Sequence, residues 1–301
     1  MQRKHKKIAV LLATYNGQLH LQQQLDSILT QVGVDVNIYI SDDGSSDRTL
    51  DIISSIEDDR IVVMPSIRSG AAGANFFRLL RDVLFFNFDY VAFSDQDDLW
   101  LEDKLLRAIS NIESKNVNIY SSNVTAFWSD GREILINKAQ LQRQWDNYFE
   151  AAGPGCTYVM TAAAANQLKE LLSKNHEQMK GIELHDWFIY AWARHNGLNW
   201  YIDPKPSMHY RQHSNNVFGV NNGFLAAKSR FSKLAGGWYL EQIMLIANAI
   251  NSLDVPPVQW IKNPSLLNKL KLIFSISSCR RRIRDRLGFI VFILMLRKNG
   301  K

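Results

Sequence analysis

Three carboxylates lie within four residues of the chain, at Asp95, Asp97 and Asp98. They directly follow residues 90–93, an apolar run that predicts a buried strand, so the acids fall at the carboxyl end of that strand. Neighbouring carboxylates repel one another unless a positive group lies between them, and a divalent cation holding a diphosphate would supply that charge. The alternative is a solvated turn, with Asp98 capping a helix that starts near Leu101.

Alternating apolar segments would position these acids. Buried strands are predicted at residues 8–13, 36–41, 61–64 and 90–93, and helices lie between them, at residues 21–32, 47–56 and 73–84. This alternation predicts an α/β fold with a mainly parallel central sheet and flanking helices. Ligands of such sheets bind at the carboxyl ends of the strands, where residues 14–16, 42–43 and 95–97 all fall.

The pattern is less regular after residue 98. Residues 117–120 and 124–128 predict two strands that pair with each other around a polar link. Helices are predicted at residues 162–172 and 182–193, and a strand at residues 200–202.

Composition narrows the function classes. The chain has 301 residues, a net charge of +6 and 46% hydrophobic residues, which is typical of a globular protein. Its basic character comes from residues 262–301, which carry 11 Lys/Arg and one acid, so we expect no nucleic-acid partner. Two cysteines suit a reducing compartment, and the N-terminus shows no secretory signal, so we expect a cytoplasmic protein.

Five short motifs occur in a fixed order and together resemble glycosyltransferase family 2 over about residues 7–220. They are Ala13-Thr14-Tyr15-Asn16, Ser41-Asp42-Asp43-Gly44-Ser45-Ser46-Asp47, Ser94-Asp95-Gln96-Asp97-Asp98, His185-Asp186-Trp187 and Tyr210-Arg211-Gln212-His213. The last two are most similar to bacterial rhamnosyltransferases that build surface polysaccharides such as O-antigen. The resemblance implies a GT-A fold, an inverting mechanism and a nucleotide-diphosphosugar donor.

The resemblance also implies a division of the chain. Residues 1–220 would form the catalytic domain, with a nucleotide-binding half at about 7–110 and an acceptor-binding half at 111–220. Residues 221–301 would form a helical, basic C-terminal extension.

On the donor side, the resemblance assigns roles residue by residue. Thr14, Tyr15, Asn16 and one of Asp42 and Asp43 would bind the nucleoside, with Tyr15 packing on the base. Asp95 would lie nearer the ribose.

The diphosphate end of the donor would be held by the metal and two basic residues. Asp97 would be the direct ligand of Mn²⁺ or Mg²⁺, Arg211 would contact the diphosphate, and His213 would contact the diphosphate or the metal.

On the acceptor side, Asp186 would be the general base that takes the proton of the attacking hydroxyl. His185, Trp187, Gly155 and Asp98 would line the acceptor site or support it. Many family members have Glu-Asp where this chain has His185-Asp186, so the base is retained and its neighbour differs. The loops 124–167 and 219–237 would select the acceptor.

These assignments predict a metal-dependent transferase that moves a sugar from a nucleotide-diphosphosugar to a hydroxyl of a growing polyprenyl-linked glycan. The rhamnosyltransferase-like motifs favour rhamnose from dTDP-rhamnose as the donor. Two alternatives stay open: a UDP-hexose-using enzyme of the same family, and a catalytically inactive glycan-binding relative. A sugar-phosphate nucleotidyltransferase would need a glycine-rich loop after the first strand, and residues 14–17 are not one.

The C-terminal segment combines apolar and basic residues. Leucines, Ile273 and Phe274 recur at helical spacing over residues 266–274, and ten apolar residues at 287–296 follow the arginine run 280–286. Ten residues are too few to span a bilayer, which needs about 20. The segment predicts either an anchor on the inner face of the cytoplasmic membrane or a helix packed on the core with a solvated arginine face.

Overall fold

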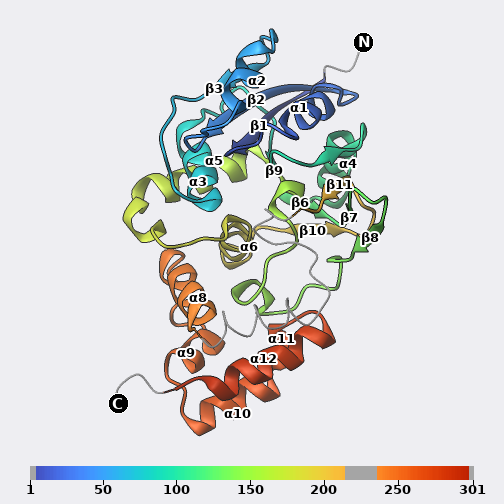
Figure 1. Cartoon of the computed structure of the whole chain (residues 1–301). Helices are drawn as coiled ribbons and strands as arrows, with labels where there is room; N and C mark the ends of the chain where they lie inside the picture. Colours follow the sequence, from blue (N-terminus) through green and yellow to red (C-terminus); the bar gives the residue numbers. More distant parts are fainter. Residues whose placement is uncertain (1–4, 214–235, 298–301) are drawn as a thin grey trace. The chain divides into compact units, whose positions relative to one another are not determined.

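The computed structural model describes residues 5–213 and 236–297 (Figure 1). The chain forms two compact units. The first comprises Met1–Ala139, Gly153–His176 and Leu198–Gly219; the second comprises Gln140–Ala152, Glu177–Gly197 and Val220–Lys301. The chain therefore passes from one unit to the other several times, and the predicted functional division at residue 220 stays a prediction.

A seven-stranded sheet is the centre of the first unit. Its order is β10-β6-β9-β4-β1-β2-β3, with β1 Lys6–Thr14, β2 Val34–Asp42, β3 Ile61–Val63, β4 Tyr90–Ser94, β6 Ile119–Ser122, β9 Val159–Thr161 and β10 Trp200–Asp203. All pairs are parallel except those made by β9, which runs antiparallel to β4 and β6. Residues 8–13 of β1 are buried without alternation, as expected for a central strand covered on both faces. The predicted mainly parallel sheet is confirmed.

Helices flank this sheet: α1 Leu21–Leu29, α2 Thr49–Ser55, α3 Ala72–Asp82, α4 Lys104–Lys115 and α5 Ala162–Lys174. Each longer helix buries one apolar face; in α1 these residues are Leu21, Leu25 and Ile28, at spacings of four and three. The apolar periodicity therefore decides which side of each helix packs on the sheet.

A second sheet of the same unit has the order β5-β11-β7-β8, with β5 Leu99–Trp100, β7 Val124–Phe127, β8 Glu133–Ile136 and β11 Met208–Arg211. The predicted pairing of residues 117–120 with 124–128 is wrong, because β6 and β7 belong to different sheets. Only Asn123 separates these strands, and one residue is too short to reverse the chain into a hairpin. Asn123 instead fixes the crossing, since its amide donates to the Pro204 carbonyl at 2.8 Å and its Oδ1 accepts from the Lys138 N–H at 2.6 Å.

The described part of the second unit is helical. It contains the short 3-10 turn η1 Asp146–Tyr148, α6 His185–His195, α8 Trp238–Ala249, α9 Pro256–Lys262, α10 Leu266–Phe274, α11 Ile276–Cys279 and α12 Ile283–Met295. The predicted helical C-terminal extension is thus confirmed over residues 236–297. Within the described ranges, none of the helices combines the length and the apolar character that crossing a membrane requires.

Candidate functional site

The carboxyl ends of β1, β2 and β4 meet at one edge of the large sheet. Thr14, the last residue of β1, is in register with Asp42 of β2, and Leu12 is in register with Ser94 of β4. Register between parallel strands therefore brings the three predicted polar segments to the same edge, as the sequence indicates.

Gln96 joins two of these segments directly. Its Oε1 accepts a hydrogen bond from the Thr14 hydroxyl at 2.6 Å and from the Tyr15 N–H at 2.9 Å, and its Nε2 donates to the Tyr15 carbonyl at 2.9 Å. Gly17 lies against the same amide, and a Cβ there would come within 2.3 Å of Gln96 Oε1. The Tyr15 side chain remains 48% exposed, so its ring is accessible for stacking.

The loop after β1 is also tied to the loop after β2. Asn16 adopts a left-handed conformation (φ 49°), which asparagine tolerates better than most residues, and its Oδ1 accepts from the Ser46 N–H at 2.8 Å. Asp42 is buried and closes its own turn, accepting from the N–H groups of Gly44 at 3.0 Å and Ser45 at 2.8 Å. These contacts give the edge a fixed backbone.

Asp43 holds a third loop at this edge. Its carboxylate accepts from the N–H groups of Ser69 and Gly70, the latter at 2.9 Å. Gly70 has a φ of 82°, a conformation that favours glycine. Nothing in the sequence pointed to this loop, because residues 69 and 70 belong to no motif and only their hydrogen bonds to Asp43 bring them to the site.

The predicted metal and diphosphate residues form one cluster. His213 Nε2 lies 2.6 Å from Asp97 Oδ2, and the Arg211 guanidinium donates through Nε to the Asp97 carbonyl at 2.8 Å and through Nη2 to Gln23 Oε1 at 2.8 Å. The His20 ring lies 5.6 Å from the His213 ring, centroid to centroid. Burial lowers the pKa of His20, and the nearby cationic residue Arg211 lowers it further. The sequence did not point to His20 or Gln23, since neither belongs to a motif.

The prediction that Asp98 caps a helix is wrong. The chain first enters β5, and α4 begins only at Lys104, without a side-chain cap from Asp103. Asp98 is instead buried and accepts from the backbone N–H of Arg211 at 3.1 Å. Burial raises its pKa well above the usual range, and the Asp97 and Asp95 carboxylates raise it further.

Asp95, Asp98 and Cys156 offer ligand atoms that all lie within 4.8 Å of one another. The Asp98 Oδ2 atom is buried and makes no hydrogen bond within the described residues, and the two carboxylates supply the hard oxygen donors that Mg²⁺ and Mn²⁺ prefer. Burial raises the pKa of the Cys156 thiol well above its usual range, and a protonated thiol is a poor ligand. Burial also raises the pKa of Asp98, so this carboxyl is an ionised ligand only where a bound cation compensates its charge. On those terms the oxygens of Asp95 and Asp98 fit a divalent cation and the cysteine does not improve the fit; the predicted ligands Asp97 and His213 do not belong to this group.

In the second unit, Asp186 lies in the first turn of α6, where its Oδ1 accepts from the Trp187 N–H at 2.7 Å. Trp187 is buried: its indole N–H donates to the Asn147 carbonyl at 3.0 Å and its ring stacks on Tyr239 at 5.5 Å. The His185 side chain is partly exposed, but the protein atoms packed around its ring lower its pKa to about 3 by desolvation. His185 is therefore a neutral imidazole at physiological pH.

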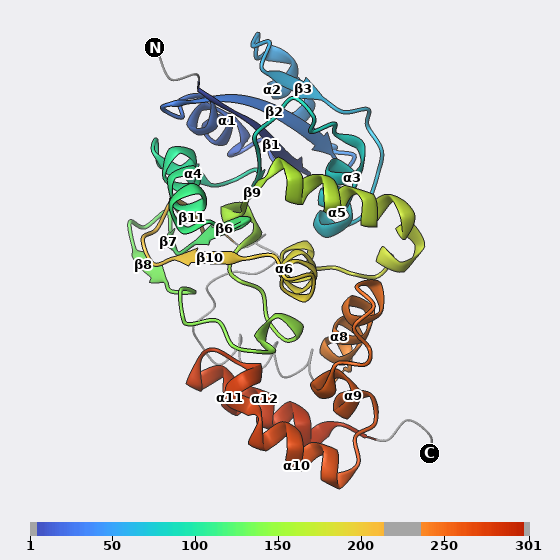
Figure 2. The ribbon, with the colours of Figure 1, turned by 180° about the vertical axis from the view of Figure 1, so that it is seen from behind.

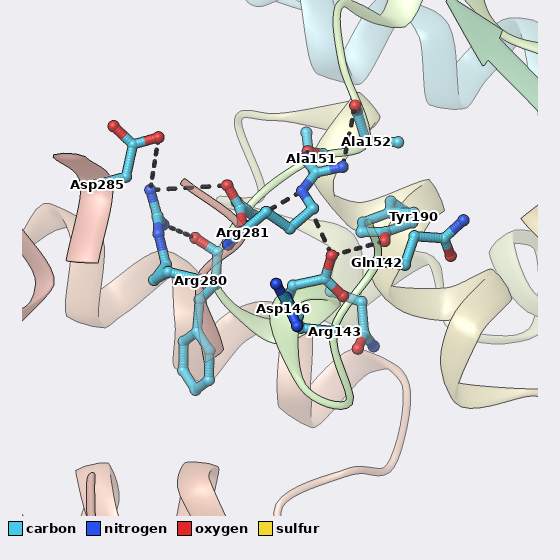
Figure 3. Close-up of polar contacts among 12 residues, drawn as sticks. Gln142, Arg143, Asp146, Ala151, Ala152, Tyr190, Arg280, Arg281 and Asp285 are labelled. Atoms are coloured by element: carbon cyan, nitrogen blue, oxygen red, sulfur yellow. Dashed lines mark hydrogen bonds and ion pairs between the residues drawn. The ribbon is translucent and has the colours of Figure 1, made fainter. Parts of the chain in front are cut away.

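A buried ion-pair network connects α6 with the start of α12 (Figure 3). Asp146 accepts from the Tyr190 hydroxyl of α6 at 3.0 Å and lies 3.4 Å from both Arg194 Nη1 and Arg281 Nε. Arg281 also lies 3.3 Å from Glu150 Oε1. The expectation of a solvated arginine face is thus wrong for Arg281, whose side chain is completely buried.

Comparison with known proteins identifies the family. The model of glycosyl transferase family 2 matches residues 9–152. The dTDP-rhamnosyl transferase RfbG of Shigella flexneri is 42% identical over 94% of this chain and 99% of its own length. The chain belongs to glycosyl transferase family 2.

Other matches of this glycosyltransferase agree with its fold and class. The UDP-Glc:alpha-D-GlcNAc-diphosphoundecaprenol beta-1,3-glucosyltransferase WfaP of Escherichia coli is 33% identical, over 38% of this chain and 45% of its own. The crystal structure of S. aureus TarS 1-349 in complex with UDP superimposes with a TM-score of 0.55 at 15% identity, covering 94% of this chain and 83% of that one. The predicted GT-A fold and the predicted nucleotide-sugar glycosyltransferase activity are confirmed.

Proposed function

We propose that this enzyme transfers rhamnose from dTDP-rhamnose, with inversion, to a hydroxyl of a lipid-linked surface glycan. The full-length similarity to a dTDP-rhamnosyl transferase supports the donor. The observation that carries the chemistry is the contact of Asp97 with His213 beside Arg211, because it gathers an anionic ligand and two basic groups at the carboxyl edge of the sheet. Residues 1–220 would supply the catalytic domain, its halves meeting near residue 110.

The nucleoside would bind at the ends of β1 and β2. The exposed ring of Tyr15 offers a stacking surface for the base. One of Asp42 and Asp43, whose buried carboxylates already accept from backbone N–H groups of this edge, would also accept the imino hydrogen of thymine. Thr14 and Asn16 shape this part of the site, since their side chains fix the loops that flank it.

The diphosphate would bind beside the acidic edge. Asp97, whose Oδ2 lies 2.6 Å from His213 Nε2, would hold Mn²⁺ or Mg²⁺ together with His213 and Asp95. A bound divalent ion would neutralise the departing diphosphate as a Lewis acid. Arg211 would add a bidentate contact to a phosphate, for which its planar guanidinium is suited. Asp98 would support this edge by fixing the Arg211 backbone.

Asp186 would act as the general base. In the transfer, the acceptor oxygen forms a bond to the anomeric carbon while the bond from that carbon to the diphosphate oxygen breaks, and the hydroxyl proton passes to the Asp186 carboxylate. One displacement inverts the configuration, and such a base contributes about 10²–10⁴-fold to the rate. Trp187 would hold the base in place by its buried contacts, and His185, at the start of the same helix, would border the acceptor.

The acceptor would be a polyprenyl-linked glycan at the inner face of the cytoplasmic membrane. A relative from Escherichia coli is named for a diphosphoundecaprenol-linked acceptor, which supports this class. The predicted acceptor loop 219–237 lies almost wholly outside the described residues, so the acceptor is proposed from the relatives alone.

Donor hydrolysis tests the proposal. The enzyme is incubated with Mn²⁺ and either dTDP-rhamnose or UDP-glucose, and the released nucleoside diphosphate is measured. We expect turnover of dTDP-rhamnose that Asp97→Asn abolishes, whereas the exposed Asp35→Asn, at the start of β2, serves as a matched control with full activity. Turnover of UDP-glucose alone would favour the UDP-hexose alternative, and no turnover of either donor would favour the inactive glycan-binding alternative.

The base is tested separately. Asp186→Asn should abolish transfer to an acceptor while the affinity for dTDP, measured by calorimetry, stays within about twofold of the wild type. Loss of dTDP binding in this variant would overturn the assignment of Asp186 as the base.

A further inference from the structure

Two neighbouring helices of the second unit each expose an apolar stripe. The exposed residues are Leu266, Leu267, Leu270 and Phe274 on α10 and Ile283, Leu287, Val291, Leu294 and Met295 on α12. Phe274 is 84% exposed and Ile283 is 76% exposed. Single exposed apolar residues are ordinary, but a gathered set of this size marks an interaction surface.

The stripes face away from the interior of the unit. At 3.6 residues per turn, the exposed residues of α12 lie opposite its buried residues Phe289, Phe292, Ile293 and Leu296. On α10 they lie opposite the buried Leu272. The helices are adjacent, because Lys269 Nζ donates to the Leu294 carbonyl at 3.1 Å, and both views show them side by side (Figures 1 and 2).

The charges around the stripes are predominantly positive. Between residues 262 and 297 the chain has nine Lys/Arg and one acid, Asp285, which lies 3.4 Å from Arg284 Nε and 3.9 Å from Arg280 Nη2. Arg280 and Arg281 are paired with carboxylates inside the unit, so their charges do not contribute to the exposed surface. Lys262 at the end of α9, Lys271 on α10 and Arg297 after α12 remain exposed.

We propose that the exposed faces of α10 and α12 form a docking surface for an anionic lipid membrane. Apolar side chains would enter the boundary of the acyl chains while the basic residues contact the lipid headgroups, as in interfacial helices. A second copy of the chain fits less well, because two surfaces with the same positive charge repel each other. Membrane docking would bring the enzyme to a lipid-linked acceptor, and this purpose is the only part of the docking proposal that rests on the proposed function.

Vesicle flotation tests the surface. The full chain is mixed with vesicles of phosphatidylcholine alone or with added phosphatidylglycerol, at low and high salt. We expect binding to the anionic vesicles, weakened by salt, and binding at least about tenfold weaker for the double variant Phe274→Glu/Leu287→Glu. The matched control is Leu84→Glu/Phe86→Glu, which changes a leucine and a phenylalanine of similar exposure in the first unit and should bind like the wild type.

Further measurements keep the outcomes distinct. Donor hydrolysis and thermal unfolding of both double variants should match the wild type, because none of the changed residues belongs to the proposed active site. Wild-type protein that ignores anionic vesicles, or a double variant that binds them as well as the wild type, would overturn the docking surface. A wild-type dimer in sedimentation that the double variant abolishes, without vesicle binding, would show that a second copy covers the stripes. Neither result would affect the proposed donor chemistry.

Discussion

Replacing Arg281 should destabilise the second unit severely. Arg281→Met leaves the completely buried Asp146 carboxylate with Arg194 at 3.4 Å and the Tyr190 hydroxyl at 3.0 Å, but without its partner from the α12 side. Removing one partner of a buried ion pair costs about 3–5 kcal/mol, since the charge that stays behind is not compensated. We expect a loss near the lower end, about 3 kcal/mol, because Asp146 keeps these two contacts.

A double-mutant cycle measures how much of this loss belongs to the pair. Arg281→Met, Asp146→Asn and the double variant are unfolded in urea, and the free energies of unfolding are compared. We expect the double variant to be more stable than the sum of the single effects predicts, by about 1–3 kcal/mol, because it buries neither charge of the pair. The control is Arg132→Met, whose exposed pair with Asp130 should contribute less than about 1 kcal/mol.

Additive single effects, within about 0.5 kcal/mol, would refute the reasoning, since independent residues show no coupling. A loss for Arg281→Met as small as that of Arg132→Met would refute it as well. Because Tyr190 and the proposed base lie on the same helix, we also expect Arg281→Met to lower kcat more than it raises the KM for the donor.

Three further predictions concern single buried or bridging residues. Burial lowers the pKa of Lys104 to about 7, so the native state binds the lysine proton less tightly than the unfolded chain does. The free energy of unfolding should therefore rise as pH increases from about 7 towards 10.5. In urea unfolding, Lys104→Met should show a weaker dependence of this free energy on pH over that window. An unchanged profile would contradict the burial of a charged amine. Gln96→Ala removes the bridge to Thr14 and should raise the KM for the donor about tenfold with a smaller change in kcat, as steady-state kinetics can check. His185→Asn should leave the pH dependence of transfer between 5 and 9 unchanged, because the pKa of this histidine is about 3; a lost inflection would show that His185 titrates.

The sequence predicted the edge of the sheet that carries the site because that prediction needs only local information. Strands and helices alternate with clear apolar periodicity, and the carboxyl-end rule then places Thr14, Asp42 and Asp95 together. Asp97 and His213 are far apart in the chain, and only the order of the motifs linked them before the structure showed their contact.

The errors arose where a long-range contact overrides a local preference. In the sequence, Asp98 has the position of a helix cap. In the structure, the residues that follow it form β5, which pairs with Met208 and His209, and the Asp98 carboxylate accepts from the Arg211 N–H instead. Arg281 has the local character of a solvated basic run, but Asp146 and Glu150 bury it. No periodicity within a window of residues encodes such partners.

The repeated passage of the chain between the two units has a consequence for biosynthesis. Helix α6, which carries Asp186, leaves the ribosome well before Tyr239 and Arg281, the residues that stack on its first turn and anchor its buried network. The surfaces of Trp187 and Tyr190 that Tyr239 and Arg281 cover must therefore wait until the C-terminal segment is synthesised. A nascent chain that stops before α8 would carry every motif residue and still lack Tyr239 and Arg281, so the support of the proposed base depends on synthesis of the C-terminal helices.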